Sequence, residues 1–229
     1  LYDLDHSAVD WSKIFLGLEG KAALSEKKQL REHQREALKA AHRHFLSHDR
    51  GKLIMACGTG KTFTSLKLIE QELEGKGLVL FLVPSIALLG QSLNDWMGDA
   101  ETPINAVCIC SDSRASRKIK RGNNNDELET SIVDLALPAS TNTASITRQL
   151  LSYRDHDGLT VVFSTYQSID VVAEAQAALL AQTGGEFGVF DFVVCDEAHR
   201  TTGVKLSTKD ESNFIKIHND EFIRGRKRL

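Results

Sequence analysis

The sequence predicts a doubly wound α/β fold, in which helices cover both faces of a mostly parallel sheet. Apolar runs alternate along the chain with patterns of helical period, as in parallel sheets with right-handed crossovers. The runs are apolar throughout, which is typical of strands covered on both faces. One run, residues 52–56, turns through glycines into an amphipathic stretch, the setting that a phosphate-binding loop requires.

The elements follow one another in a regular order. The first is a predicted helix over residues 21–48, ended by Asp49-Arg50-Gly51. The predicted strands are residues 52–56, 78–83, 104–110, 160–165 and 190–195, and the helices between them are 61–74, 86–97, 145–154 and 167–182. Ligands of such sheets bind at the carboxyl ends of the strands, so we expect the site there.

Residues 111–143 interrupt this alternation and are predicted to form a mobile or functional insertion. They include a basic cluster: Arg114, Arg117, Lys118, Lys120 and Arg121. Two interpretations stay open, a solvated loop and a contact with nucleic-acid phosphates.

Composition restricts the class of protein. The chain has 229 residues, 41% of them hydrophobic, and at this length roughly 70% of the unfolded surface can be buried. The net charge is −3, so any contact with a nucleic acid must come from a local patch. The sequence has neither an 18-residue apolar run nor a signal peptide, which predicts a cytoplasmic protein with no membrane role.

The cysteine pattern favours buried, reduced thiols. The chain has four cysteines, Cys57, Cys108, Cys110 and Cys195, and three of them lie in or beside apolar, strand-like runs. No second ligand pair follows Cys108-x-Cys110 at the spacing of a zinc site. This usage fits a cytoplasmic protein.

The strongest local signal is the loop after the first predicted strand. Its glycines allow the backbone N–H groups to turn inward around a polyphosphate. In such loops the lysine reaches the β- and γ-phosphates and the hydroxyl binds Mg²⁺. Met55 stands where the general pattern has glycine, so Gly58 and Gly60 must make the turn. The predicted nucleotide-binding residues here are Cys57, Gly58, Thr59, Gly60, Lys61 and Thr62.

The second signal is Asp196-Glu197, two adjacent carboxylates directly after an apolar strand. One carboxylate can hold Mg²⁺ while its neighbour orients and deprotonates the attacking water. We assign Asp196, with Thr62, to the metal and Glu197 to the water. Lys61, Asp196 and Glu197 are therefore the predicted catalytic residues, and the predicted reaction is metal-assisted hydrolysis of a nucleoside triphosphate.

Together these motifs resemble motifs I and II of superfamily 2 helicases and translocases, the second as Asp196-Glu197-Ala198-His199. The resemblance implies that Gln34 reads adenine, although an exposed polar helix residue is the alternative. It also implies that His199 couples the ATP site to a later motif. Two strand-to-helix turns resemble backbone-contacting motifs, which makes Pro84, Ser85, Gln91, Thr165, Tyr166 and Gln167 candidate nucleic-acid contacts. Ordinary turns are the alternative for both segments.

The exact residues of these motifs indicate which families within superfamily 2 the chain resembles. Residues 55–62 and 196–203 resemble the motor of type I restriction enzymes, and residues 81–91 are closer to type ISP restriction–modification enzymes. The resemblance covers residues 30–229 as a first RecA-like lobe of a P-loop NTPase. Residues 1–29 would then be a linker or brace from a preceding nuclease domain, in a chain that begins inside a longer protein. The family continues into a strand carrying a Thr-Ala-Thr motif and into a second lobe, both absent here.

The resemblance implies a function for the parent protein. The expected parent is an ATP- and Mg²⁺-dependent translocase on double-stranded DNA in a restriction–modification or phage-defence enzyme. Its expected partners are the second RecA-like lobe, a nuclease, and target-recognition and methyltransferase parts. Two alternatives stay open: a helicase that separates DNA or RNA strands, and a nucleotide-gated nucleic-acid-binding module with little turnover.

Overall fold

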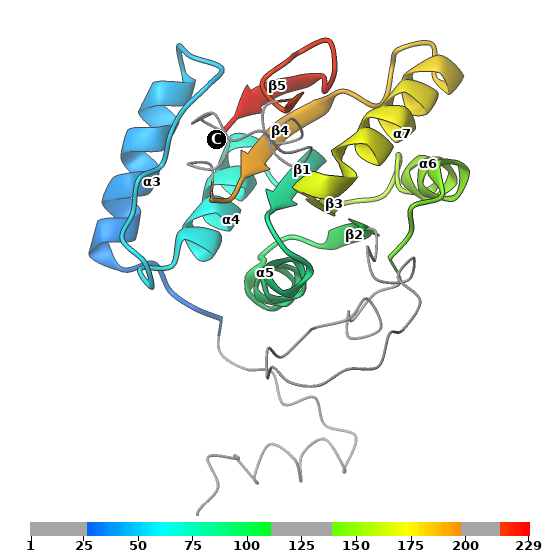
Figure 1. Ribbon diagram of the computed structural model, residues 1–229. Helices are drawn as coiled ribbons and strands as arrows, with labels where there is room; N and C mark the ends of the chain where they lie inside the picture. The colour runs from blue at the N-terminus through cyan, green and yellow to red at the C-terminus, as the bar shows by residue number, and fades with distance from the viewer. Residues whose placement is uncertain (1–26, 111–138, 198–215) are drawn as a thin grey trace, which may run out of the picture.

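The computed structural model describes residues 27–110, 139–197 and 216–229 (Figure 1). The strands are β1 (Gly77–Val83), β2 (Ile104–Ile109), β3 (Leu159–Thr165), β4 (Phe190–Cys195) and β5 (Gly225–Arg228). The helices are α3 (Glu32–Phe45), α4 (Lys61–Glu72), α5 (Ile86–Asp99), α6 (Thr143–Ser152), the 3₁₀ helix η2 (Tyr166–Ser168) and α7 (Ile169–Gln182). Predictions for residues 1–26, 111–138 and 198–215, including the basic cluster, lie outside the described residues.

The described strands form one parallel sheet in the order β2-β3-β1-β4-β5. Helices α3, α4 and α5 pack on one face, and α6 and α7 pack on the other (Figure 1). The predicted doubly wound α/β fold is confirmed. Since all the strands are parallel, the carboxyl ends of β1, β3 and β4 lie at one edge of the sheet.

Strand β1 shows why the apolar runs have no alternation. Successive side chains of a strand point to opposite faces of the sheet. Val79, Phe81 and Val83 therefore join the core under α3, α4 and α5, whereas Leu78, Leu80 and Leu82 join the core under α6 and α7. Both faces are dry, so both sets of positions are apolar.

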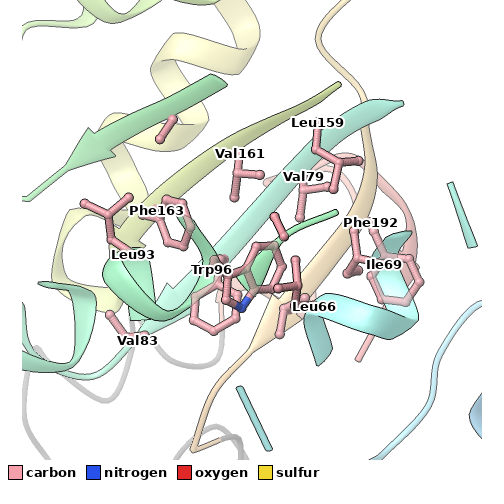
Figure 2. Close-up of a cluster of buried hydrophobic side chains, with 14 of the residues drawn as sticks. Leu66, Ile69, Val79, Val83, Leu93, Trp96, Leu159, Val161, Phe163 and Phe192 are labelled. Atoms are coloured by element: carbon pink, nitrogen blue, oxygen red, sulfur yellow. The ribbon is translucent and has the colours of Figure 1, made fainter. Parts of the chain in front are cut away.

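Aliphatic side chains, packed around a few aromatic rings, fill the first of these cores (Figure 2). Trp96 of α5 is fully buried and meets Phe81 and Phe163 edge to face, with ring centroids 5.0 and 5.7 Å apart. Burying one such large side chain stabilises the fold by about 1.5–3 kcal/mol. The core thus fixes α5 against the middle of the sheet.

Most elements lie close to their predicted bounds, and four of the five predicted strands are present. The predicted helix over residues 21–48 is shorter within the described residues and begins at Glu32. Helix α7 begins two residues later than predicted, because η2 precedes it. Helix α5 begins where predicted, since the Ser85 hydroxyl caps it by accepting a hydrogen bond from the Leu88 N–H.

The predicted strand over residues 52–56 is wrong in this structure. Strand β5 is its described neighbour, and their pairing stops at Gly51, whose N–H donates to the Arg228 carbonyl. Beyond that point the segment has no ladder among the described residues, and Ile54 is 91% exposed. The apolar pattern predicted burial, but a strand also needs a neighbour.

Strand β5 was not predicted, because Gly225-Arg226-Lys227-Arg228 has no apolar pattern. It lies between β4 and residues 49–51 and takes its stability from backbone pairing with both. Its basic side chains bind acidic partners: Lys227 contacts Glu72 at 2.6 Å, and the buried Arg228 contacts Asp220.

No helix in the described part of the chain is both long and apolar enough to cross a membrane.

Candidate active site

The predicted phosphate loop is a tight turn at the start of α4. The Thr59 hydroxyl and N–H both donate to the Ala56 carbonyl, at 2.6 and 3.4 Å. Gly58 and Gly60 have φ values of 74° and 85°, a conformation that side chains with a Cβ rarely adopt. Gly60 is the N-cap of α4, so the loop delivers Lys61 to the positive end of the helix dipole. The Thr59 N–H is paired within the turn, and the binding of a phosphate group here stays a prediction.

Gln34 is built into this loop from α3. The side chain is only 5% exposed, so the alternative of an exposed helix residue is wrong. Its Nε2 donates to the Thr59 carbonyl at 2.9 Å, and its Oε1 accepts from the Arg31 N–H at 2.9 Å. A Cβ on Gly60 would lie 2.5 Å from the Gln34 amide nitrogen, so the close packing depends on that glycine. Both polar atoms of the Gln34 side-chain amide are hydrogen-bonded within the protein, and recognition of adenine by Gln34 stays a prediction.

The structure brings Lys61 and Glu197 together from residues far apart in the chain. Lys61 Nζ lies 3.5 Å from Glu197 Oε1, and both side chains are 32% exposed. Lys61 is the first residue of α4, and Glu197 lies just beyond β4 at the carboxyl edge of the sheet. A lysine and a carboxylate are therefore presented together beside the phosphate loop.

The peptide group between Asp196 and Glu197 is held from both sides. Its carbonyl, that of Asp196, accepts from the Tyr166 hydroxyl at 2.9 Å. Its N–H, that of Glu197, donates to Asp196 Oδ1 at 3.0 Å. Glu197 has a φ of 56°, a left-handed conformation that costs about 1–2 kcal/mol. Each hydrogen bond contributes a net of about 1 kcal/mol, so the two offset that strain.

The electrostatics of this corner follow from its burial. Burial raises the pKa of the Asp196 carboxyl above its ordinary value, although the Glu197 N–H and the charge of Lys61 oppose the shift. Burial also raises the pKa of Tyr166 well above its ordinary value, so its hydroxyl stays protonated and remains a donor. An ionised Asp196 therefore favours a nearby positive charge.

Thr62, the predicted metal ligand on α4, is fixed by its backbone. Its carbonyl accepts from the Ser65 hydroxyl at 2.8 Å and from Trp96 Nε1 at 3.1 Å. Through Trp96, helix α5 is tied to the beginning of α4. The half-buried Thr62 side chain lies directly after Lys61.

Most of the candidate nucleic-acid contacts lie where β1 and β3, which are neighbours in the sheet, end together, whereas Gln91 lies in the second turn of α5. Ser85, Gln91 and Gln167 are exposed, and Gln167 Nε2 donates to the Pro84 carbonyl at 3.4 Å. Thr165 and Tyr166 are buried, at 3% and 0% exposure. Any contact that these two residues make with a nucleic acid would therefore use their backbone. His199 lies outside the described residues.

Cys195, the last residue of β4, makes a hydrogen bond with the Tyr166 side chain, and Cys57 stands in the predicted phosphate loop. Cys108 and Cys110 are buried and Cys57 is exposed. Desolvation raises the pKa of Cys108 to about 12 and that of Cys195 to about 11, so both stay protonated at neutral pH. In the regions that the structure describes, no group of three or more metal-ligating side chains is found.

Two features of the site escaped the sequence analysis. Tyr166 was assigned to nucleic acid, and nothing in the sequence pointed to its bond with Asp196, thirty residues away. The hydrogen bond from Trp96 to the Thr62 carbonyl was not predicted either, because a tryptophan in an apolar helix pattern indicates only a core residue. Both depend on the order of the strands, which local patterns do not contain.

Comparison with known proteins places the chain in a family. Residues 27–222 match the family described as type III restriction enzyme, res subunit. Among curated proteins, the chain is similar to the "Probable helicase A859L" of African swine fever virus. In the Malawi isolate the identity is 27% over 219 residues, which is 94% of this chain and 21% of the viral protein. In the Pretoriuskop isolate it is 27% over 171 residues, 75% of this chain and 16% of the viral protein.

Two solved structures are more similar. One is a nuclease-deletion mutant of the type ISP restriction–modification enzyme LlaGI with a DNA substrate mimic, at 40% identity and a TM-score of 0.67. The other is the ATP-dependent type ISP enzyme LlaBIII bound to DNA, at 38% identity and a TM-score of 0.77. The matches cover 88% and 100% of this chain but only 17% and 14% of theirs.

Proposed function

The chain belongs to the family described as type III restriction enzyme, res subunit. From this membership we propose that the chain is the ATP-binding first lobe of a double-stranded DNA translocase. The translocase would serve a restriction–modification or phage-defence enzyme. The observation that carries the proposal is Lys61 of the phosphate loop lying 3.5 Å from Glu197 of the acidic pair. A lysine for phosphates and a carboxylate for water at one corner are the parts of a nucleotide hydrolase.

The residues of the site suit ATP and Mg²⁺. The Thr62 hydroxyl and the Asp196 carboxylate are the hard oxygen ligands that Mg²⁺ prefers, and the pKa of Asp196, raised by burial, marks a carboxylate that a cation would stabilise. When bound, Mg²⁺ would neutralise charge on the phosphates. Lys61 would hold the β- and γ-phosphates, Glu197 would orient the attacking water and take its proton, and Gln34 would read adenine. His199 would couple the site to the second lobe.

Double-stranded DNA is the proposed track. LlaGI and LlaBIII, the similar structures, are complexes with a DNA substrate mimic and with DNA. Pro84, Ser85 and Gln167 are exposed or half-exposed where two strands end, and the exposed Gln91 follows on α5. Such residues contact the phosphate backbone, which carries no sequence information, so target recognition would belong to another part of the protein.

The remainder of the protein is also a proposal, because this chain spans about a fifth or less of the length of the relatives it matches. We place residues 30–229 in the first lobe, with residues 111–143 as an insertion, and residues 1–29 in a linker or brace. The parent would add a second RecA-like lobe, a nuclease, and target-recognition and methyltransferase parts. Its proposed location is the cytoplasm.

A strand-separating helicase is the second candidate, favoured by the similarity to the protein called a probable helicase. The experiment that decides is ATP turnover by the full-length protein with duplex DNA, single-stranded DNA, RNA or none. Stimulation by duplex DNA alone supports the translocase, and a preference for single strands or RNA supports the helicase. Bound nucleotide with no stimulation by any of them would contradict both and leave a nucleotide-gated binding module.

A further inference from the structure

We propose that Tyr166 is a positioning residue that couples the DNA-facing edge of this lobe to its catalytic carboxylates. The inference rests on the proposed function and deepens it, because it names the side chain through which DNA would regulate ATP turnover. The juxtaposition that supports it is a continuous path of contacts from Pro84, through Gln167 and Tyr166, to Asp196 and Glu197.

The first step of the path is at the surface. Gln167 is exposed, and its amide donates to the Pro84 carbonyl, so the ends of β3 and β1 are bridged at the candidate DNA contact. A phosphate approaching the polar groups of this edge would compete for the Gln167 amide. Binding there would therefore displace Gln167, or lock it in place.

The second step leads inward through η2. Gln167 and Tyr166 are consecutive residues of this one-turn helix, and the Thr165 and Ser168 hydroxyls lie 3.3 Å apart across it. Helix α7 follows without a break and is anchored in the core by Ile169 and Val172. Because Gln167 and Tyr166 share this single turn, a shift of Gln167 would be passed on to Tyr166.

The third step reaches the catalytic peptide. Tyr166 is fully buried, and its hydroxyl holds the Asp196 carbonyl at 2.9 Å. That carbonyl belongs to the same planar peptide as the Glu197 N–H, so rotating one rotates the other. Since Glu197 is in a strained left-handed conformation, the orientation of this peptide decides where its carboxylate points.

The last step is the chemistry. Glu197 lies 3.5 Å from Lys61, so the peptide orientation also sets the place of the carboxylate relative to the phosphates that Lys61 would hold. Displacing a catalytic group by about 1 Å can cost on the order of 10²-fold in rate. A small movement at the Tyr166 hydroxyl is therefore enough to change turnover.

The test is Tyr166→Phe in the full-length protein, which removes the hydroxyl and keeps the ring. The measurement is ATP turnover with saturating duplex DNA and without DNA. We expect the ratio of the two rates to fall about fivefold or more, because Tyr166→Phe removes the net hydrogen bond to the Asp196 carbonyl and also the bond with Cys195. The KM for ATP and the DNA concentration that gives half-maximal stimulation should stay within about twofold of the unaltered values.

Tyr153→Phe is the matched control, because its hydroxyl lies at the end of α6 and contacts Gln149 instead of the site. The control should keep the full ratio. If Tyr166→Phe does not fold, as judged by thermal unfolding, the exposed Gln167→Ala replaces it and should lower the same ratio at saturating DNA.

The other outcomes overturn the inference. An unchanged ratio in Tyr166→Phe would show that the hydroxyl carries no coupling. A ratio that recovers at higher DNA concentration would reduce Tyr166 to a DNA-binding role. If no nucleic acid stimulates ATP turnover by the unaltered protein, the proposed function and the coupling are both refuted. If duplex DNA stimulates the unaltered protein and Tyr166→Phe to the same extent, only the coupling is refuted.

Discussion

Lys61 and Glu197 show how the site is prepared at the level of single residues. Each is one third exposed, and they face each other at 3.5 Å. In water-exposed positions such a pair contributes at most about 1 kcal/mol, so it holds the two side chains only loosely. In the proposed function, phosphate groups would therefore take Lys61 from Glu197 at little cost.

This arrangement predicts the behaviour of Glu197→Gln in the full-length protein. Nucleotide affinity should be retained or slightly increased, because Lys61 loses a competing carboxylate. ATP turnover should fall about 10²–10⁴-fold, the usual contribution of a general base. Equilibrium binding of a fluorescent ATP analogue and steady-state turnover measure the two effects.

The exposed Glu36→Gln on α3 serves as the control and should change neither quantity. Loss of nucleotide binding in Glu197→Gln would contradict the assigned role, because it would place Glu197 among the residues that hold the nucleotide.

At the level of elements, residues 52–56 and strand β1 have similar apolar sequences and different environments. Ile54 is 91% exposed, whereas Leu80 of β1 is fully buried. In the 229-residue chain, Ile54→Ala should change the free energy of unfolding by no more than about 0.5 kcal/mol. Leu80→Ala should lower it by about 2–5 kcal/mol. Urea unfolding compares the two directly, and equal losses would show that Ile54 is covered in solution.

Glu72 joins three elements through its carboxylate. Only 3% of its side chain is exposed, and it accepts from His42 of α3 and Lys227 of β5, both at 2.6 Å. Burial would raise the pKa of Glu72, but the hydrogen bonds from Lys227 and His42 outweigh it and leave the pKa below its ordinary value near 4.5. The ionised carboxylate therefore stabilises the fold above that ordinary value, and this stabilisation is lost as the pH falls through the lowered pKa.

Glu72→Gln tests this linkage. At neutral pH the variant should be less stable by about 1–3 kcal/mol, the range for hydrogen bonds to charged groups. The difference from the unaltered chain should vanish on acidification below the lowered pKa. Unfolding free energies measured from neutral pH down through the lowered pKa of Glu72 provide the check, and comparison with the variant separates the effect of Glu72 from that of the other carboxylates. The exposed ion-paired Glu186→Gln is the control and should cost less than about 1 kcal/mol at any pH.

For the whole molecule, the family resemblance implies that half of the ATP site lies on a second lobe. The 229-residue chain should therefore bind nucleotide and hydrolyse it poorly, because an arginine of the kind that the second lobe supplies is worth about 10³–10⁵ in rate. Turnover by this chain and by the full-length protein, at equal nucleotide occupancy, measures the difference. Lys61→Ala in the full-length protein should abolish turnover, and rapid hydrolysis by the 229-residue chain would contradict the division of the site.

The sequence by itself determined the fold class and the resemblance to type ISP enzymes, which the 38–40% identity confirms, and it located the loop and the acidic pair whose roles stay predictions. These depend on local signals: the period of apolar residues, glycines where φ must be positive, and carboxylates that directly follow a strand. Such signals persist whatever the rest of the chain does.

Only the tertiary structure decided how these parts meet. It buried Gln34 against Thr59, carried the Tyr166 hydroxyl to the Asp196 carbonyl, made a strand of the basic residues 225–228 and left Ile54 exposed. Each outcome depends on which strand lies beside which, because hydrogen bonds and burial between distant residues are set by the strand order β2-β3-β1-β4-β5. No local pattern contains that order. The apolar residues of a strand indicate that the strand is buried, but they do not indicate which strands or helices bury it.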